Sequence, residues 1–225
     1  MYRYYFHQFI SVGSEILYPL YVSLPVSEEE LRSHTQEFKL AGFSGCIGST
    51  DATHIAEKCS YHLRNNHLGA KQHITSSTFN LTVNHRRRIL STTSGMPGRW
   101  DDKTVVLFDG FVNGIHKGQI HNNAKFNLFE YVPAGNIVLK EYTGSWFIVD
   151  NGYLKWSTTV PPLKVTALEK ERQLSHWLEP LRKDVKCTFG ILKGRWRILK
   201  TGIRLQGVEV VKKNCEHVVR CTICC

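Results

Sequence analysis

The chain has 225 residues, 42% of them hydrophobic, so its composition supports a folded domain and argues against extensive disorder. Its 29 Lys and Arg residues exceed its 19 Asp and Glu residues, and the resulting net charge of +10 predicts a polyanionic partner such as nucleic acid. The sequence contains no run of roughly 20 apolar residues that would cross a membrane and no signal peptide. We therefore expect an intracellular protein whose seven Cys residues are free thiols.

The N-terminal part, residues 1–41, is predicted to be a helical segment. The sequence Ser27-Glu28-Glu29-Glu30 is a capping box, which predicts a helix that begins after Ser27 and ends before Gly42. The stretch that follows, residues 42–55, is typical of a buried strand that ends on Asp51. A carboxylate at the end of a core strand is poorly solvated and needs a cation or another partner. Asp51 is therefore the first candidate functional residue.

A β-hairpin is predicted over residues 79–93, where apolar and polar side chains alternate on both sides of a polar turn. Its tip carries Arg86, Arg87 and Arg88. After the strand breaks at Gly95–Gly98, Asp101 is a plausible N-cap, and Asp102 falls in the first turn of the helix that it starts. We expect one helix here, which carries Val105, Phe108 and Val112 on one face and ends at Gly114.

A second hairpin is predicted over residues 126–142, around the turn 133–136. It leads into an apolar strand, Ser145–Val149, that ends on Asp150 at a Gly turn, just as the strand before Asp51 ends on an acid. A helical run over 167–178 is followed by a separate helix after Pro180, because proline disrupts a helix interior. Basic side chains on this last helix and just after it are the following: Arg182, Lys186, Lys193, Arg195, Arg197 and Lys200.

This order of elements predicts an α/β protein with a ribonuclease H-like fold: a mixed central sheet, flanking helices and an inserted β-hairpin. In such a fold, clustered carboxylates bind two divalent cations that activate a water molecule or a DNA 3′-hydroxyl for phosphodiester chemistry. Asp is also common at strand ends because it favours turns, so spacing alone does not decide the matter.

Four stretches resemble the DDE endonuclease domain of Harbinger-type (PIF/Harbinger) transposases: Gly45–Ile55, Phe79–Leu90, Val149–Tyr153 and Arg182–Lys193. They occur in the family's order, and the resemblance runs from about Leu24 to the end of the chain. It implies a nuclease domain over residues 42–225 that is truncated at its C-terminus. It also implies a protein of the nucleus, which would stay in the cytoplasm when a partner is missing.

Carried over to this chain, the resemblance implies that Asp51, Asp102 and Asp150 are catalytic residues that bind Mg²⁺ or Mn²⁺. For Asp102 the alternative is a purely structural role in the first turn of a helix. Lys186 stands where the family has its catalytic Glu. An ammonium cannot ligate a metal ion, so we expect Lys186 to form ion pairs with Asp51 and Asp150 instead.

Three functions remain open at this point. The first is a metal-dependent DNA endonuclease that performs cleavage or strand transfer, with its activity in doubt because of Lys186. The second is a non-catalytic DNA-binding or interaction module derived from a transposase, and the third is a decayed element. We expect DNA to contact the basic residues Arg86, Arg87, Arg88, Lys193, Arg195, Arg197 and Lys200, and a separate DNA-binding protein to supply sequence specificity.

Overall fold

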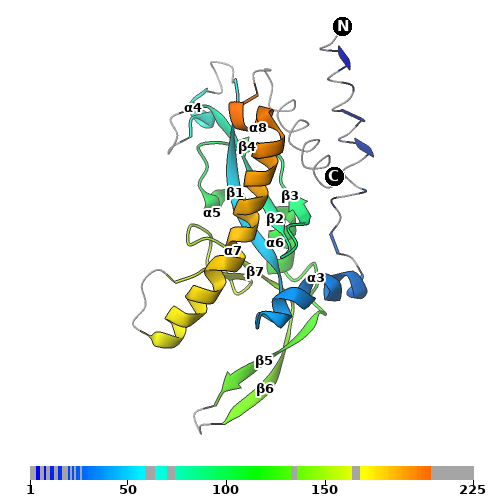
Figure 1. Cartoon of the computed structure of the whole chain (residues 1–225), viewed down its shortest axis with the longest axis vertical. Helices are drawn as coiled ribbons and strands as arrows, with labels where there is room; N and C mark the ends of the chain where they lie inside the picture. The colour runs from blue at the N-terminus through cyan, green and yellow to red at the C-terminus, as the bar shows by residue number, and fades with distance from the viewer. Residues whose placement is uncertain are drawn as a thin grey trace.

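The computed structural model describes residues 27–58, 64–69, 74–132, 136–163 and 168–203, together with scattered positions between 4 and 25. It is an α/β structure in which helices cover a mixed sheet and a two-stranded ribbon extends from one end (Figure 1). None of its helices in these ranges has the length and hydropathy needed to cross a membrane. The C-terminal part of the predicted nuclease domain, beyond residue 203, lies outside the described residues.

The central sheet has the strand order β3-β2-β1-β7-β8, with β4 paired to β2. Its strands are β1 (Cys46–Ala56), β2 (Ser76–Val83), β3 (Ile89–Thr92), β4 (Met96–Pro97), β7 (Trp146–Ile148) and β8 (Thr159–Val160). The β1–β2 and β2–β3 pairs are antiparallel, which confirms the predicted hairpin with its basic turn. The β1–β7 and β7–β8 pairs are parallel. This mixed arrangement is compatible with the predicted fold class.

The expectation that the first strand ends on Asp51 is wrong, because β1 continues to Ala56. Asp51 lies in the middle of the strand, opposite Leu81 of β2, and the pairing continues as far as Ala56 and Ser76. The long neighbouring strand supplies backbone partners on both sides of Asp51, so the acid does not terminate the ladder.

The helices are α3 (Glu28–Leu40), α4 (Arg64–His67), α5 (Asp102–Leu107), α6 (Gly110–His116), α7 (Glu169–Arg195) and α8 (Arg197–Thr201). The predicted capping box is present: the Ser27 hydroxyl accepts from the Glu30 backbone N–H, and the Glu30 carboxylate accepts from the Ser27 N–H. The short helix α4 lies in the connection between β1 and β2.

The single helix expected between Asp101 and Gly114 is in fact two helices. Asp101 caps α5 as predicted, but α5 ends at Leu107 and Asp109 caps a second helix, α6, which continues to His116. Phe108 lies at the break and is 60% exposed, so it does not share a buried face with Val105 and Val112.

Pro180 lies inside one continuous helix, α7, whereas the sequence predicted a separate helix after it. Leu178 and Leu181, on either side of it, are buried in one cluster, while Pro180 itself is exposed. Packing therefore holds both halves in line, and solvent can hydrate the carbonyl that proline leaves unpaired.

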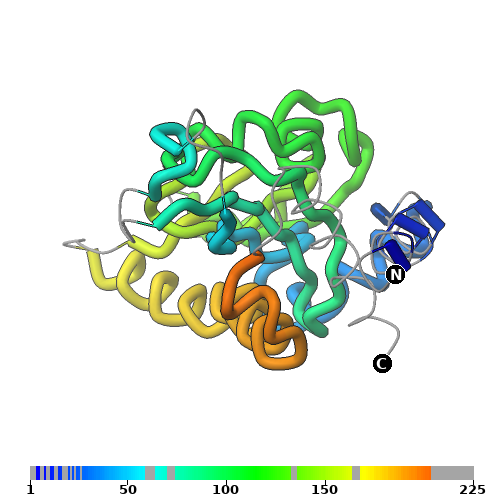
Figure 2. Tube along the Cα trace, turned by 90° about the horizontal axis from the view of Figure 1, so that it is seen from above, coloured from blue at the N-terminus to red at the C-terminus, as the bar shows by residue number. Residues whose placement is uncertain are grey.

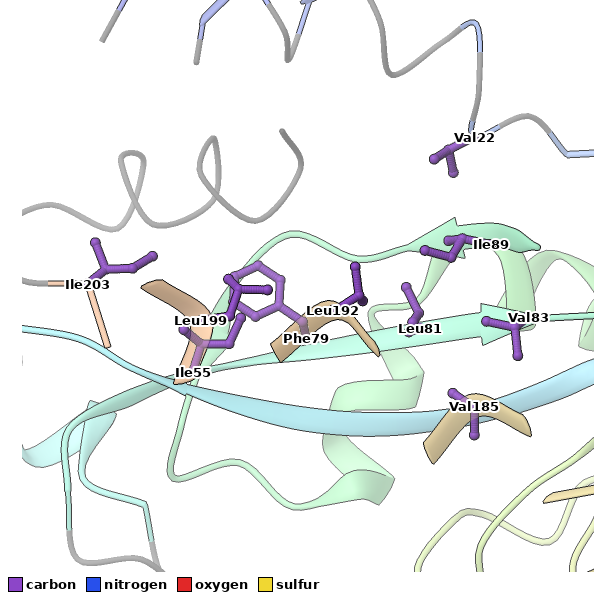
Figure 3. Close-up of a cluster of buried hydrophobic side chains, with 10 residues drawn as sticks. All are labelled: Val22, Ile55, Phe79, Leu81, Val83, Ile89, Val185, Leu192, Leu199 and Ile203. Carbon is purple, nitrogen blue, oxygen red and sulfur yellow. The ribbon is translucent and has the colours of Figure 1, made fainter. Parts of the chain in front are cut away.

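Helices cover the sheet on both faces, with α7 and α8 on one and α5 and α6 on the other (Figure 2). On the α7 side, the core contains Ile55, Phe79, Leu81, Val83, Ile89, Val185, Leu192 and Leu199 (Figure 3). The side chains of β1 alternate between the two faces of the sheet, because successive residues of a strand point in opposite directions. Asp51 therefore faces α7, and its neighbour Thr50 faces the α5–α6 side.

The predicted inserted hairpin is confirmed as a separate two-stranded sheet of β5 (Lys125–Tyr131) and β6 (Ile137–Thr143). Its base packs on Gly45: a Cβ at that position would lie 2.6 Å from the Phe126 ring, and Gly45 also has a φ of +80°. The hairpin leads directly into β7, the strand that precedes Asp150.

Candidate functional site

Two of the three candidate aspartates lie at the same level of the sheet, Asp51 within β1 and Asp150 just after the parallel strand β7. Ser49 of β1 is in register with Ile148 of β7, and Asp51 and Asp150 each follow two residues later. Because adjacent strands are about 4.8 Å apart, this register places the two acids side by side. The parallel pairing of β1 and β7, which no local pattern encodes, thus brings together residues 99 positions apart in the sequence.

Asp102 joins them from the first turn of α5. Its carboxylate packs against the turn after Asp150: a Cβ added to Gly152 would lie 2.7 Å from Asp102 Oδ2. The negative charges of Asp150 and Asp102 both act on the Asp51 carboxyl. Asp51, Asp102 and Asp150 are called the aspartate cluster below.

Burial controls the ionisation of Asp51, whose side chain is 13% exposed. The pKa of Asp51 is raised to about 6. Loss of solvation is the main cause; the Lys186 ammonium and a hydrogen bond from the Ala52 N–H oppose it, and the charges of Asp150 and Asp102 add to it. The fold therefore keeps an acid in a position where its charged form is unfavourable. Such strain is common at functional sites.

Two cationic side chains of α7 form ion pairs with the aspartate cluster. Lys186 Nζ lies 3.9 Å from Asp51 Oδ2, and Arg182 Nη1 lies 3.2 Å from Asp150 Oδ1. The expected pairing of Lys186 with Asp51 is present, but the described partner of Asp150 is Arg182. Arg182 also contacts Glu179, at 3.0 Å. One turn of helix separates Arg182 from Lys186, so both project toward the same edge of the sheet.

These ion pairs decide how well the cluster suits a divalent cation. Three carboxylates are suitable oxygen ligands for Mg²⁺ or Mn²⁺. However, two of them already face a protein cation, and within the described ranges no three His, Cys, Asp or Glu side chains are grouped closely enough to hold a metal. The donor set as arranged therefore fits a divalent cation poorly, because a metal would have to displace the Lys186 ammonium.

A buried polar network supports β1 from the opposite face of the sheet. Asn80 Nδ2 donates to Asp109 Oδ2 at 2.6 Å and to Thr50 Oγ1 at 3.0 Å. Tyr153 Oη donates to Asn80 Oδ1 at 2.5 Å, and Thr82 Oγ1 to Thr50 Oγ1 at 3.1 Å. Burial raises the pKa of both Asp109 and Tyr153. The network thus ties β1 to α6 and to the turn that follows Asp150.

Sequence reasoning missed Asp109, Asn80 and Tyr153. One local signal was available: Asp109-Gly110 precedes an apolar run, which is a typical N-cap pattern. The alternation of Asn80 and Thr82 with Phe79 and Leu81 is typical of a strand with one solvent-facing side, whereas β2 is buried on both faces.

The predicted DNA-contacting residues occupy two regions at opposite ends of β2. Arg86, Arg87 and Arg88 follow Val83 in an exposed turn, where Arg86 pairs with Glu37 and Arg87 lies 3.8 Å from Asp184. At the other end, the exposed Arg195, Arg197 and Lys200 lie at the end of α7 and in α8. Lys193 differs from both groups: its ammonium donates to Thr53 Oγ1 at 2.8 Å and to the His54 carbonyl at 3.2 Å.

A family model described as plant transposon protein matches residues 20–223, which is most of the chain and includes every residue of the aspartate cluster. The chain belongs to the plant transposon protein family. Searches of curated proteins and of solved structures return no match. The transposon origin inferred from the sequence is thus confirmed at the level of the family.

The stability of this plant transposon protein is expected to fall as the pH rises through the titration of Asp51. Its folded pKa of about 6 exceeds the ordinary value of 3.8, so between these values the folded state binds more protons than the unfolded chain. The free energy of unfolding therefore decreases as the pH rises. The decrease is complete above the folded pKa and is about 3 kcal/mol at most. Asp51→Asn should remove this slope and raise the urea midpoint near neutral pH.

Asp101→Asn is the matched control for that measurement. Hydrogen bonds from the Thr104 side chain and backbone lower the pKa of Asp101, so its contribution to stability disappears as the pH falls. The two variants should therefore change the pH slope in opposite directions. An unchanged slope in Asp51→Asn would contradict the role of burial at Asp51.

Proposed function

We propose that this plant transposon protein is a DNA-binding domain of Harbinger-type DDE descent, with a ribonuclease H-like fold, whose aspartate cluster is neutralised by its own cations and does not support metal-dependent cleavage. The observation that carries the proposal is the ion pair of Lys186 with Asp51, reinforced by that of Arg182 with Asp150. Lys186 occupies the position at which a DDE nuclease needs an acid.

The chemistry of the cluster supports a binding role over a catalytic one. In a DDE nuclease a divalent cation would activate the attacking oxygen and stabilise the leaving oxygen. Here an ammonium and a guanidinium balance two of the three carboxylates. They reduce the repulsion that the cluster would exert on a DNA phosphate, but neither can coordinate the reacting oxygens as a metal does.

The charge of the chain supports DNA as the partner. The net charge is +10, and the exposed Arg195, Arg197 and Lys200 are close together in sequence and space. Lys and Arg side chains that neutralise phosphates release counterions, so DNA affinity should fall steeply with salt. A separate protein that supplies sequence specificity, and residence in the nucleus, are parts of the same proposal.

Anisotropy with a labelled duplex, measured over a range of salt concentrations, tests DNA binding. Neutralising Arg195, Arg197 and Lys200 with Gln should reduce the slope of log K against log[salt] by about 0.9 for each DNA phosphate that these side chains neutralise in the wild type. The matched control replaces three exposed lysines from other parts of the fold, Lys39, Lys117 and Lys155, with Gln and so lowers the net charge equally. Equal slopes in the two triple variants would contradict a localised DNA surface.

A cleavage assay of the wild-type protein with Mg²⁺ or Mn²⁺ tests the second half of the proposal. We expect duplex DNA to be bound and left intact. Nicking that depends on the metal would overturn the non-catalytic assignment, whereas weak binding that is insensitive to salt would overturn DNA binding and favour a decayed element.

A further inference from the structure

The β5–β6 hairpin carries an exposed apolar surface that neither the core nor the aspartate cluster uses. Figure 1 shows it extending away from the central sheet. In its register, Phe129 is opposite Leu139, and Tyr131 is opposite Ile137. Directly opposed residues of an antiparallel pair share a face, and so do positions two residues apart. These four side chains therefore form one patch, called the hairpin patch below.

The hairpin patch is far more exposed than apolar side chains of this size normally are. Phe129 is 79% exposed, Tyr131 65%, Ile137 63% and Leu139 56%. The Lys170 ammonium lies 4.5 Å from the centre of the Tyr131 ring and leaves most of it uncovered. A contiguous exposed apolar patch of this kind marks an interaction site in a soluble protein.

The charges of the hairpin identify the kind of partner. Residues 125–143 contain two Lys and two Glu, and all four are paired: Lys125 with Glu141 and Lys140 with Glu130, each at 2.9 Å. The hairpin is thus neutral in a chain of net charge +10 and has no free cation for a phosphate. Two copies of so basic a chain repel each other, and contact through the neutral hairpin lowers that repulsion, although the Lys170 ammonium lies beside Tyr131.

We infer that the hairpin patch binds the same patch of a second copy, face to face about a two-fold axis. Such an axis places one surface of each copy on the identical surface of the other, so a patch of four apolar side chains is complementary to itself. The four side chains expose about 500 Å² per copy, and a two-fold contact would bury about 1,000 Å² in total, the lower end of specific interfaces. The contact is independent of DNA binding, because it uses none of the basic residues assigned to DNA.

Sedimentation velocity of the full chain, at concentrations up to about 100 μM, tests this inference. The wild type should show a monomer–dimer equilibrium. Leu139→Lys and Leu139→Glu should each weaken dimerisation by about 100-fold or more, because either change buries like charges against each other at the interface. An equimolar mixture of these two variants should dimerise again, because the opposite charges then meet.

Leu40→Lys is the matched control, since Leu40 is 78% exposed on α3 and lies outside the hairpin. It should dimerise like the wild type. A wild type that stays monomeric throughout the concentration range would overturn the second copy as partner. A dimer that Leu139→Lys affects no more than Leu40→Lys does would overturn the hairpin patch as the interface, and a mixture that stays monomeric would overturn the two-fold arrangement.

Discussion

Replacing Asp109 with alanine is expected to lower the free energy of unfolding by about 3 kcal/mol or more. Asp109 is 1% exposed, and its carboxylate accepts hydrogen bonds from Asn80 Nδ2 at 2.6 Å, from the Phe111 N–H at 2.9 Å and from the Val112 N–H at 3.0 Å. Alanine would leave all three donors without this acceptor. Two of them are the backbone groups that start α6, and the third fixes Asn80.

The chain contains a matched control for this experiment in the preceding helix. Asp101 caps α5 in the same way, and its carboxylate accepts from the Thr104 N–H at 2.9 Å, but it is exposed. Asp101→Ala should therefore cost only about 1 kcal/mol, the usual value for an N-cap. Urea denaturation of both variants measures the difference, and equal destabilisation would show that the buried network contributes little beyond capping.

The same variant also tests whether the network positions β1. Thr50, which accepts from Asn80 and from Thr82, is adjacent to Asp51 and lies on the opposite face of the strand. We expect hydrogen exchange at the amides of β1 near Thr50 to be faster in Asp109→Ala than in Asp101→Ala, measured at equal global stability. Equal exchange rates in the two variants would show that Asp109 contributes to the stability of α6 and does not position β1.

Lys186→Glu is expected to change the response of the protein to divalent cations. The substitution removes the ammonium from Asp51 and adds a fourth carboxylate beside the aspartate cluster, so repulsion should destabilise the variant when no metal is present. At about 100 times the dissociation constant, a cation that binds only the folded state stabilises it by about 2.7 kcal/mol. For a chain of this size that corresponds to a rise in Tm of about 5–10 °C.

Thermal unfolding with and without Mg²⁺ or Mn²⁺ measures this effect, and the wild type should show little shift. Lys183→Glu is the matched control, because it reverses the same charge on an exposed position of α7 three residues away. Lys186→Gln removes the ammonium without adding a ligand, so its shift should be smaller than that of Lys186→Glu. If Lys183→Glu and Lys186→Glu respond equally, the effect is one of net charge and the cluster does not select the metal.

Local sequence predicted those features of the fold that depend on neighbouring residues. The Ser27 capping box, the hairpin around Arg86–Arg88, the inserted hairpin and the N-cap at Asp101 are all present. In each of these cases the determining contacts join residues close in sequence, so the pattern contains the information. The motif stretches likewise indicated the transposon family, which the match over residues 20–223 confirms.

The predictions that were wrong concern places where distant contacts override a local preference. Pro180 favours a helix end, yet Leu178 and Leu181 are buried on either side of it and keep α7 continuous. At the break near Phe108, the carboxylate of Asp109 caps α6 and also accepts a hydrogen bond from Asn80, 29 positions away in the sequence. Packing and buried hydrogen bonds can outweigh helix propensity, which amounts to at most about 0.7 kcal/mol for ordinary residues and about 3 kcal/mol for proline.

The sequence by itself determined most of the elements, the family, the candidate acids and the presence of Lys186 on the helix expected to face them. The tertiary structure alone decided their relations: the parallel register of β1 and β7 aligns Asp51 with Asp150, and α7 places Lys186 and Arg182 opposite them. The physical reason is that charge and residue type are local properties, whereas solvation and ion pairing depend on which segments pack together. Burial then raises the pKa of Asp51 to about 6, a value that its own sequence neighbours would not produce.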